Sequence, residues 1–461
     1  MVQFRILFRG LLLVTALACA SGSPAWSSER KPAGRGALAA YVARPDASFG
    51  WREVASGRLG SAEYAEYVLT SQTWRGMPWK HQLFILRPAN MKPDARQGLL
   101  FIHGGRWKPE YDTERHEIVP ANESMLFLRL AESIRAPVVI LAQVPFQPLF
   151  DRKEDALIAY TFEQYLQTGD SEWPLLLPMV KSATRAMDAV QTIVKERWGA
   201  SLDSFTVSGA SKRGWTSWLT AATDKRVMAV APIVIDVLNM PAQMDHQRAT
   251  WGEFSDEIRD YSDLDLQAQL KTERGKSLLS MVDPYSYRKL LTQPKLILLS
   301  TNDRYWPLDA LKIYWPELPN PKHVLYVPNQ GHGLRDTDRV IGGLSALHRY
   351  AAAGKTLPRT TWSFASAATD VLTVDVKADR PVQQVLMWSA RSPTRDLRNA
   401  HWTSTECEKK GDRHACSATR SEPGYMAAFA ETSFLDEGSP AFSTTTTVCI
   451  MEPKAGKAAG C

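Results

Sequence analysis

The sequence predicts an α/β fold with a mostly parallel sheet and helical insertions, followed by a smaller β-sandwich-like domain. Three observations carry this prediction. Strands alternate with helices over about 300 residues, in the region 37–356, which is typical of a parallel sheet with right-handed crossovers. Two stretches, at about 154–174 and 238–287, interrupt that alternation. Beyond residue 357 helical periodicity gives way to short alternating strands, as in a sandwich.

The composition is that of a globular protein. Of 461 residues, 44% are hydrophobic and 23% are charged, which excludes collagen, coiled coil and wholesale disorder. Lys and Arg number 55 and Asp and Glu 49, so the net charge is +6, and no basic run concentrates it. We therefore expect no nucleic-acid partner.

The first twenty residues resemble an export signal. Arg5 and Arg9 precede the short apolar run Leu11–Ala20, which is too short to span a membrane. We expect a signal peptide over residues 1–20, and Cys19 leaves open a lipid-modified N-terminus. No other segment has 18 uninterrupted apolar residues, so no membrane span is expected.

Hydrophobic patterns place the elements of the region 37–356. An antiparallel pair is expected first, and continuous apolar runs then indicate central strands buried on both faces. The predicted strands are Tyr64–Gln72, Trp79–Leu86, Gly98–His103, Pro137–Gln143, Ser204–Val207, Val227–Ile235, Lys295–Ser300 and His323–Val327. The predicted helices are Leu176–Trp198, Arg213–Ala222, Asp309–Trp315 and Val340–Ala353.

The remaining segments have distinct patterns. The insertion at 154–174 is rich in aromatic residues, and the one at 238–287 is too long for an unstructured loop, so it should carry helices of its own, as a lid would. In the β-sandwich-like domain, 357–455, strands are expected at Val371–Val376 and Val385–Ser389.

Four cysteines lie in the last sixty residues. Cys407 and Cys416 flank a polar segment typical of a hairpin loop, so we predict a disulfide there, as an exported protein allows. Pairings with Cys449 and Cys461 stay open, because four cysteines allow three connectivities. Their spacing fits no zinc site, and their position excludes a cysteine nucleophile.

The segment Ser204–Gly214, SFTVSGASKRG, carries the clearest chemistry. An apolar strand runs into Ser211 and a helix follows at once, which is typical of a nucleophile elbow. The helix N-terminus adds partial positive charge, and the N–H of Lys212 can face a developing oxyanion. The second glycine, Gly214, comes three residues after the serine instead of the usual two. The alternative role for Ser211 is helix capping.

Two further strand ends complete a catalytic arrangement. Asp303 follows the strand Lys295–Ser300, and His332 stands between glycines after the strand His323–Val327. The order Ser, Asp, His is that of α/β hydrolases, in which the histidine takes the serine proton and the acid fixes its tautomer. Asp236, at the end of Val227–Ile235, is an alternative acid.

Other residues complete the expected site. Gly104 and Gly105 follow a central strand, where such enzymes place a second oxyanion donor. No metal-binding, phosphate-loop or dinucleotide motif occurs, so neither metal nor cofactor is expected. Four tryptophans could line an aromatic cleft or simply pack the core and lid: Trp173, Trp215, Trp251 and Trp306.

Several long motifs suggest a family. The chain resembles the PhoPQ-activated pathogenicity-related proteins in GASKRGWTSWLT (209–220), EDALIAYTFEQYL (154–166), LPMVKSATRAMDAVQ (177–191) and APIVIDVLNM (231–240). The resemblance implies an exported α/β-hydrolase-like protein of a bacterial envelope, periplasmic or secreted, in a family whose members include some linked with virulence regulation. It supplies no substrate. The elbow alone is similar to that of glucuronoyl esterases, which have a basic residue after the nucleophile.

We therefore expect an exported serine hydrolase that acts on a small-molecule, glycan or peptide substrate. An esterase is favoured over a peptidase. The alternative is a non-catalytic binding or signalling protein on a hydrolase scaffold, since a fold does not fix a function. The presence of all three triad candidates weighs against that alternative.

Overall fold

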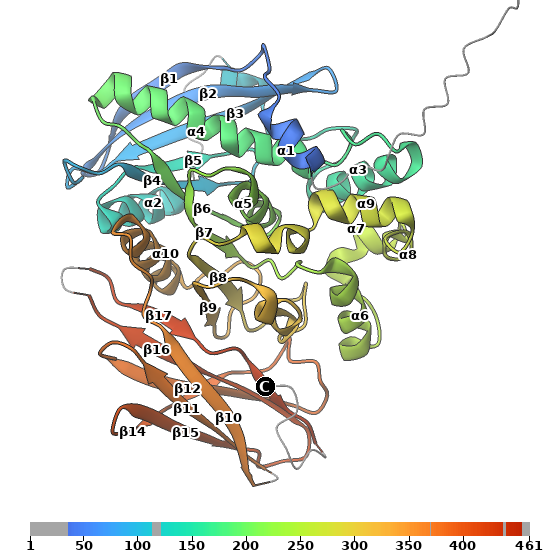
Figure 1. Cartoon of the computed structure of the whole chain (residues 1–461), viewed down its shortest axis with the longest axis vertical. Coiled ribbons are helices and arrows are strands. Elements are labelled where there is room, and N and C mark those ends of the chain that lie inside the picture. Colours follow the sequence, from blue (N-terminus) through green and yellow to red (C-terminus); the bar gives the residue numbers. More distant parts are fainter. Residues whose placement is uncertain (1–35, 113–120, 369, 437–438, 454–461) are drawn as a thin grey trace, which may run out of the picture. The chain divides into compact units, whose positions relative to one another are not determined.

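A long mixed sheet runs through the molecule (Figure 1). The computed structural model describes residues 36–112, 121–368, 370–436 and 439–453, which all belong to one compact unit, 32–461. In spatial order the first nine strands are β1 (Gly50–Leu59), β2 (Ala62–Trp74), β3 (Met77–Arg87), β5 (Val138–Leu141), β4 (Gln97–Ile102), β6 (Ser204–Ala210), β7 (Val227–Ile233), β8 (Lys295–Ser300) and β9 (Lys322–Val327).

The sheet is antiparallel at its first edge and parallel in its centre. Strands β1, β2, β3 and β5 pair antiparallel, while β5, β4, β6, β7, β8 and β9 pair parallel. Because successive side chains of a strand point to opposite faces, Leu99 and Leu100 of β4 enter two different cores. Both faces are covered, as the apolar runs predicted.

Helices form the two outer layers. One core includes the buried faces of α4 (Leu176–Trp198) and α5 (Lys212–Thr223), with α1 (Gly36–Ala43) packed on α4. The other core contains α2 (Ala121–Ile134) and α10 (Thr337–Ala352). The chain has the expected α/β-hydrolase architecture, with helices on both faces of a mostly parallel sheet.

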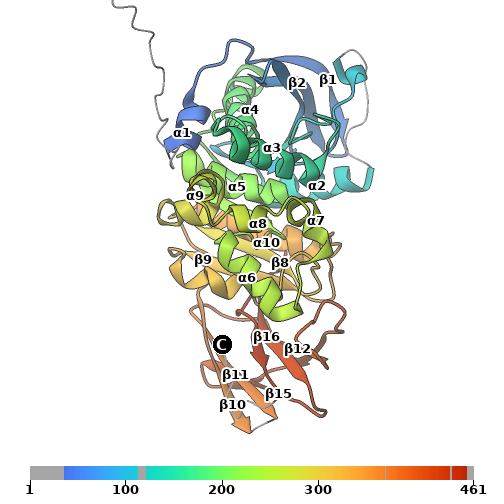
Figure 2. The same cartoon turned by 90° about the vertical axis from the view of Figure 1, so that its right-hand side faces the viewer.

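The two insertions form a cluster of helices beside the sheet (Figures 1 and 2). The first contains α3 (Glu154–Thr168), and the second has helices of its own, as predicted. Helix α3 contacts three helices of the second insertion. Those of the second insertion are α6 (Met240–Trp251), α7 (Arg259–Ser262), α8 (Leu266–Gln269) and α9 (Glu273–Val282).

One predicted helix is wrong. The segment Asp309–Trp315 forms two short 3₁₀ turns, Ala310–Ile313 and Trp315–Glu317, instead of an α-helix. Pro316 explains the difference, because proline has no N–H to donate and disfavours helical geometry in the residue before it.

The C-terminal region is antiparallel and has two sheets around a third core. Strand β17 pairs with β9 through Thr445 and Val324, so one of these sheets continues the central sheet. That sheet has β12 (Gln384–Ser392), β13 (Thr403–Glu406), β16 (Tyr425–Phe434), β17 (Phe442–Thr445) and β18 (Cys449–Met451). The other has β10 (Thr360–Ala368), β11 (Val371–Ala378), β15 (Arg413–Thr419) and β14 (Glu408–Lys410).

Cys407 and Cys416 form a disulfide across the β14–β15 hairpin, with Cα atoms 4.6 Å apart. The predicted signal peptide, Cys19 and Cys461 lie outside the described residues. In the described part of the chain, no helix combines the length and apolar character that crossing a membrane would need.

Candidate active site

Ser211 occupies a strained turn between β6 and α5. Its φ of 57° and ψ of −128° lie in a region that residues other than glycine rarely adopt. The N–H of Ser211 donates to the Ile233 carbonyl at 2.8 Å, which ties the turn to the neighbouring strand β7. The side chain makes no capping hydrogen bond to α5. The Ser211 hydroxyl therefore lies at the end of β6 and does not cap α5.

Steric crowding explains why Gly209 and Gly214 are glycines. A Cβ on Gly209 would lie 2.8 Å from the Arg213 carbonyl oxygen, and one on Gly214 would lie 2.8 Å from the Gly209 oxygen and 2.7 Å from Ile235 Cγ2. The first turn of α5 thus packs directly on the end of β6. The glycine at the third position after the serine is the one that this close packing requires.

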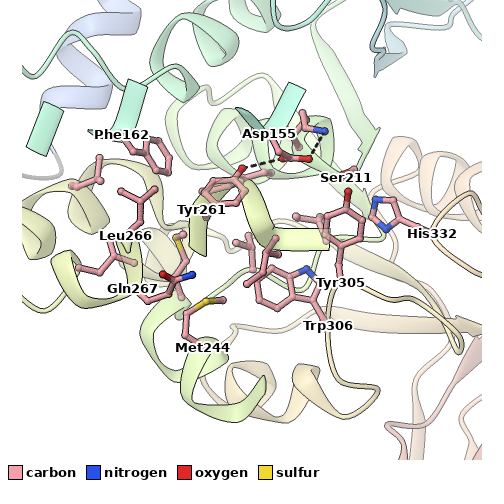
Figure 3. A pocket seen from close by; sticks show the side chains of 18 residues that line it. Asp155, Phe162, Ser211, Met244, Tyr261, Leu266, Gln267, Tyr305, Trp306 and His332 are labelled. Atoms are coloured by element: carbon pink, nitrogen blue, oxygen red, sulfur yellow. Dashed lines mark hydrogen bonds and ion pairs between the residues drawn. The ribbon is translucent and has the colours of Figure 1, made fainter. Parts of the chain in front are cut away.

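Asp303 and His332 meet beside Ser211. His332 Nδ1 lies 3.1 and 2.9 Å from the two carboxylate oxygens of Asp303, which also accepts the N–H of Tyr305 at 3.0 Å. The Tyr305 ring stacks on the imidazole with centroids 4.2 Å apart. The other ring nitrogen, Nε2, is buried and has no hydrogen-bond partner among the described residues. Ser211 and His332 line the same two pockets, and Figure 3 shows them side by side.

Asp236 has different surroundings. It is 4% exposed and accepts a hydrogen bond from the Tyr314 hydroxyl. Burial, helped by the charges of Asp303 and Asp309, raises the pKa of Asp236 to about 7 although the Tyr314 hydrogen bond opposes this rise. Asp303, and not Asp236, is the carboxylate bonded to His332.

The oxyanion candidates lie around the same serine. Lys212 begins α5, and its N–H has no partner within the helix, as is usual for a first turn. Gly104 lines one of the pockets with Ser211, and a Cβ there would meet the Arg213 guanidinium at 2.7 Å. Gly105 is not among the lining residues, and its carbonyl accepts from Gln147 at 2.8 Å.

The two basic side chains after the serine are neutralised by the start of α3. Lys212 Nζ lies 2.9 Å from Glu154 and 3.0 Å from Asp155, and Arg213 contacts Glu154 through two hydrogen bonds of 2.8 Å. Burial alone would raise the pKa of Glu154, but Arg213 and Lys212 lower it to about 2. The first insertion is thereby fixed to the elbow. Sequence reasoning missed this role of Glu154 and Asp155, because no local pattern reveals a contact between segments so far apart.

The first pocket has about 710 Å³ of empty space and a mostly apolar lining (Figure 3). Trp215 and Trp306 line it, as the sequence suggested, but Trp173 and Trp251 do not. Trp173 instead packs under the Arg75 guanidinium at 3.4 Å, and Trp251 under that of Arg398 at 4.1 Å. Both rings thus lie against cations of other segments.

The second pocket, with about 1120 Å³ of empty space, lies on the side of Gly104 and His103. Ser211 and His332 thus line both pockets. Such a position allows the two arms of a substrate to leave the reacting centre in different directions. Among the described residues, no group of three metal-ligating side chains occurs.

The chain is similar to several known proteins. Autocrine proliferation repressor protein A of Dictyostelium discoideum is 31% identical over 375 residues, which are 76% of this chain and 73% of that protein. Two solved acetyl xylan esterases resemble the chain. The enzyme from Paenibacillus sp. R4 is 15% identical, covers 65% of this chain and 86% of its own, and has a TM-score of 0.43. The enzyme from Thermoanaerobacterium sp. JW/SL YS485 is 14% identical, covers 66% of this chain and 90% of its own, and also has a TM-score of 0.43. The family model of the PhoPQ-activated pathogenicity-related proteins matches residues 38–398. The chain belongs to that family.

Proposed function

We propose that this protein is a serine hydrolase that cleaves esters, with Ser211 as nucleophile, His332 as base and Asp303 as the acid that orients it. One observation carries the proposal: Asp303 holds His332 through Nδ1, while Nε2 is buried and finds no hydrogen-bond partner among the described residues. His332 and Ser211 line the same pockets. A neutral imidazole in this tautomer accepts a proton at Nε2.

The reaction follows from these positions. Ser211 Oγ attacks the ester carbonyl carbon while His332 takes its proton, and the carbonyl oxygen becomes an oxyanion that the N–H groups of Lys212 and Gly104 stabilise. The imidazolium then gives its proton to the leaving alcohol, which leaves an acyl-enzyme. Water, deprotonated by His332, releases the acid and restores the serine.

The pocket favours an ester over a peptide substrate. Its charged groups, Lys212 and Asp155, pair with each other at 3.0 Å, and most other lining side chains are apolar. We place the reaction outside the cytoplasm, in the periplasm or beyond, on the basis of the predicted signal peptide. The Cys407–Cys416 disulfide supports this placement, because disulfides persist in oxidising compartments.

The second candidate is a signalling protein that binds without catalysis. The name of the Dictyostelium relative, which describes repression of proliferation, favours this candidate. This candidate predicts that Ser211→Ala leaves any ester turnover unchanged.

Hydrolysis of a short 4-nitrophenyl ester separates the two candidates. Ser211→Ala should reduce turnover to the uncatalysed rate, since loss of a triad member costs several orders of magnitude in kcat. Ser71→Ala is a matched control, because Ser71 also contacts a histidine, His81, at 3.0 Å. Both residues are fully buried, and the other ring nitrogen of His81 lies against backbone carbonyls of Ala142 and Gln143. Equal turnover by the wild type and Ser211→Ala would refute the proposal.

A further inference from the structure

Two buried nitrogens in the apolar pocket have no hydrogen-bond partner among the described residues. One is His332 Nε2, which the proposed reaction uses. The other is Nε2 of Gln267, which Figure 3 shows across the pocket from Ser211. A buried donor without an acceptor is costly, so native structures nearly always provide one. The proposed reaction uses the first nitrogen, and an acceptor on a ligand would satisfy the second.

Several other polar groups around this pocket are satisfied within the protein. Asp155 accepts from the Tyr261 hydroxyl at 2.9 Å and pairs with Lys212, while Trp215 Nε1 donates to the Val282 carbonyl at 2.6 Å. Between Ser211 and Gln267 a substrate therefore meets mainly carbon. Most of the remaining wall is apolar: Phe162, Ile235, Val237, Met240, Met244, Ile258, Leu266, Leu270, Leu278 and the ring of Trp306.

Gln267 stands on a short helix that is anchored at both ends. Leu266 and Leu270, on either side of it, are 3% and 6% exposed and line the same pocket. Gln269 fixes the turn from within, because its side-chain amide donates to the Leu264 carbonyl at 3.1 Å. The backbone that carries Gln267 is thus held against the pocket, as a recognition residue requires.

We propose that Gln267 recognises a hydrogen-bond acceptor at the far end of an apolar substrate arm whose other end is the ester at Ser211. This inference rests on the proposed function and adds the substrate class. The substrate is an ester with an apolar chain that ends in an uncharged carbonyl, ether or hydroxyl oxygen. A plain alkyl chain of the same length would fill the pocket but leave the Gln267 donor unpaired.

Matched ester pairs test the inference. Each pair has one ester with a plain alkyl chain and one with a chain of the same length that ends in a methyl ketone. The pairs form a series of increasing chain length. One series carries the chain on the acyl side and a second carries it on the alcohol side, because either arm could enter the pocket. At the length that reaches Gln267, kcat/KM for the ketone should exceed that for the alkyl ester by about tenfold, the size of one hydrogen bond.

Substitutions assign the preference to the residue. In Gln267→Leu and in Gln267→Glu, which both remove the donor, the ketone-to-alkyl ratio should fall to about one or below. The ratio compares two substrates on one enzyme, so partial loss of folded protein cancels. Gln167→Leu, the same substitution at an exposed position of α3, should keep the wild-type ratio.

The outcomes are distinct. A ketone preference that survives in both Gln267 variants, or none at any length in either series, would overturn the inference while Ser211-dependent hydrolysis of short esters still supports the proposed function. A preference for chains that end in an ammonium group, which only donates, would also overturn it. Absence of Ser211-dependent hydrolysis would refute the proposed function and the inference with it.

Discussion

Two carboxylic acids lie at the ends of neighbouring strands, and their surroundings give them different properties. Asp303 follows β8 and bonds to His332 Nδ1, whereas Asp236 follows β7 and is buried against Tyr314. Only Asp303 can orient the imidazole. Asp303→Asn should therefore lower kcat about 10⁴-fold by spoiling the His332 tautomer. Asp236→Asn should cost much less in the same ester assay, and the reverse ranking would move the acid to the earlier strand.

Asp236 should instead affect the pH dependence of stability. Its folded pKa of about 7 lies above its ordinary value of 3.8, so its contribution to stability is fully present below about pH 4 and is lost as the pH rises through about 7. Between about pH 5 and about pH 8 the free energy of unfolding should fall more in the wild type than in Asp236→Asn. Urea unfolding of both proteins measures this difference. Parallel pH profiles would show that the Asp236 carboxyl is not held protonated by the fold.

The sequence indicated the residues of the proposed reacting centre but not the residues around it. Ser211, Asp303 and His332 were predictable because each follows an apolar strand, and parallel strands end at one edge of a sheet. Tyr305 and Gln267 were not, since their roles depend on contacts between separate elements. The tryptophans were a poor guide to the cleft, because two of the four candidates, Trp173 and Trp251, pack against arginine side chains elsewhere.

At the scale of elements, long regular segments were predictable and short ones were not. Helix α4 and strand β8 have the predicted bounds, because their apolar patterns persist over their whole length. Helix α8, which carries Gln267, has only four residues and no pattern of its own. Sequence reasoning also missed α2, whose amphipathic pattern precedes β5. The pairing of β17 with β9 joins strands more than a hundred residues apart, so no local signal announces it.

The β14–β15 hairpin gives a prediction of its own. Its disulfide joins residues nine apart, so the closed loop is short and contributes somewhat under about 3 kcal/mol to stability in the chain-entropy model. Replacing Cys407 and Cys416 together by serine should lower the free energy of unfolding of the C-terminal region by up to that amount. Ester hydrolysis should persist, since neither cysteine lines the pockets of Ser211. Non-reducing peptide mapping that finds both thiols free would contradict the pairing.

At the scale of the whole molecule, the C-terminal region holds the loops that carry the proposed acid and base. Asn302, next to Asp303, donates to the Ala400 carbonyl at 2.8 Å. Asn329, three residues before His332, makes two hydrogen bonds with the backbone of Trp402, at 2.9 and 2.8 Å. The segment between β12 and β13 thus fixes both loops at once.

Asn329→Gly tests this positioning role. Asn329 has a φ of 56°, which glycine adopts without strain, so the substitution removes the two hydrogen bonds and keeps the backbone geometry available. We expect kcat to fall about tenfold with KM little changed, because the pocket is intact while the base is less well placed. Asn329→Asp, which keeps the acceptor for the Trp402 N–H, should lose less. A change confined to KM would contradict the positioning role.

The central claim is that Ser211 is an activated nucleophile, and covalent labelling tests it most directly. The intact wild-type protein should react with a fluorophosphonate, and peptide mass spectrometry should find the adduct on Ser211. Ser211→Ala should not be labelled, and His332→Ala should be labelled far more slowly, since the serine is then no longer deprotonated by its base. An unlabelled wild type, or an adduct on another serine that persists in Ser211→Ala, would contradict the account.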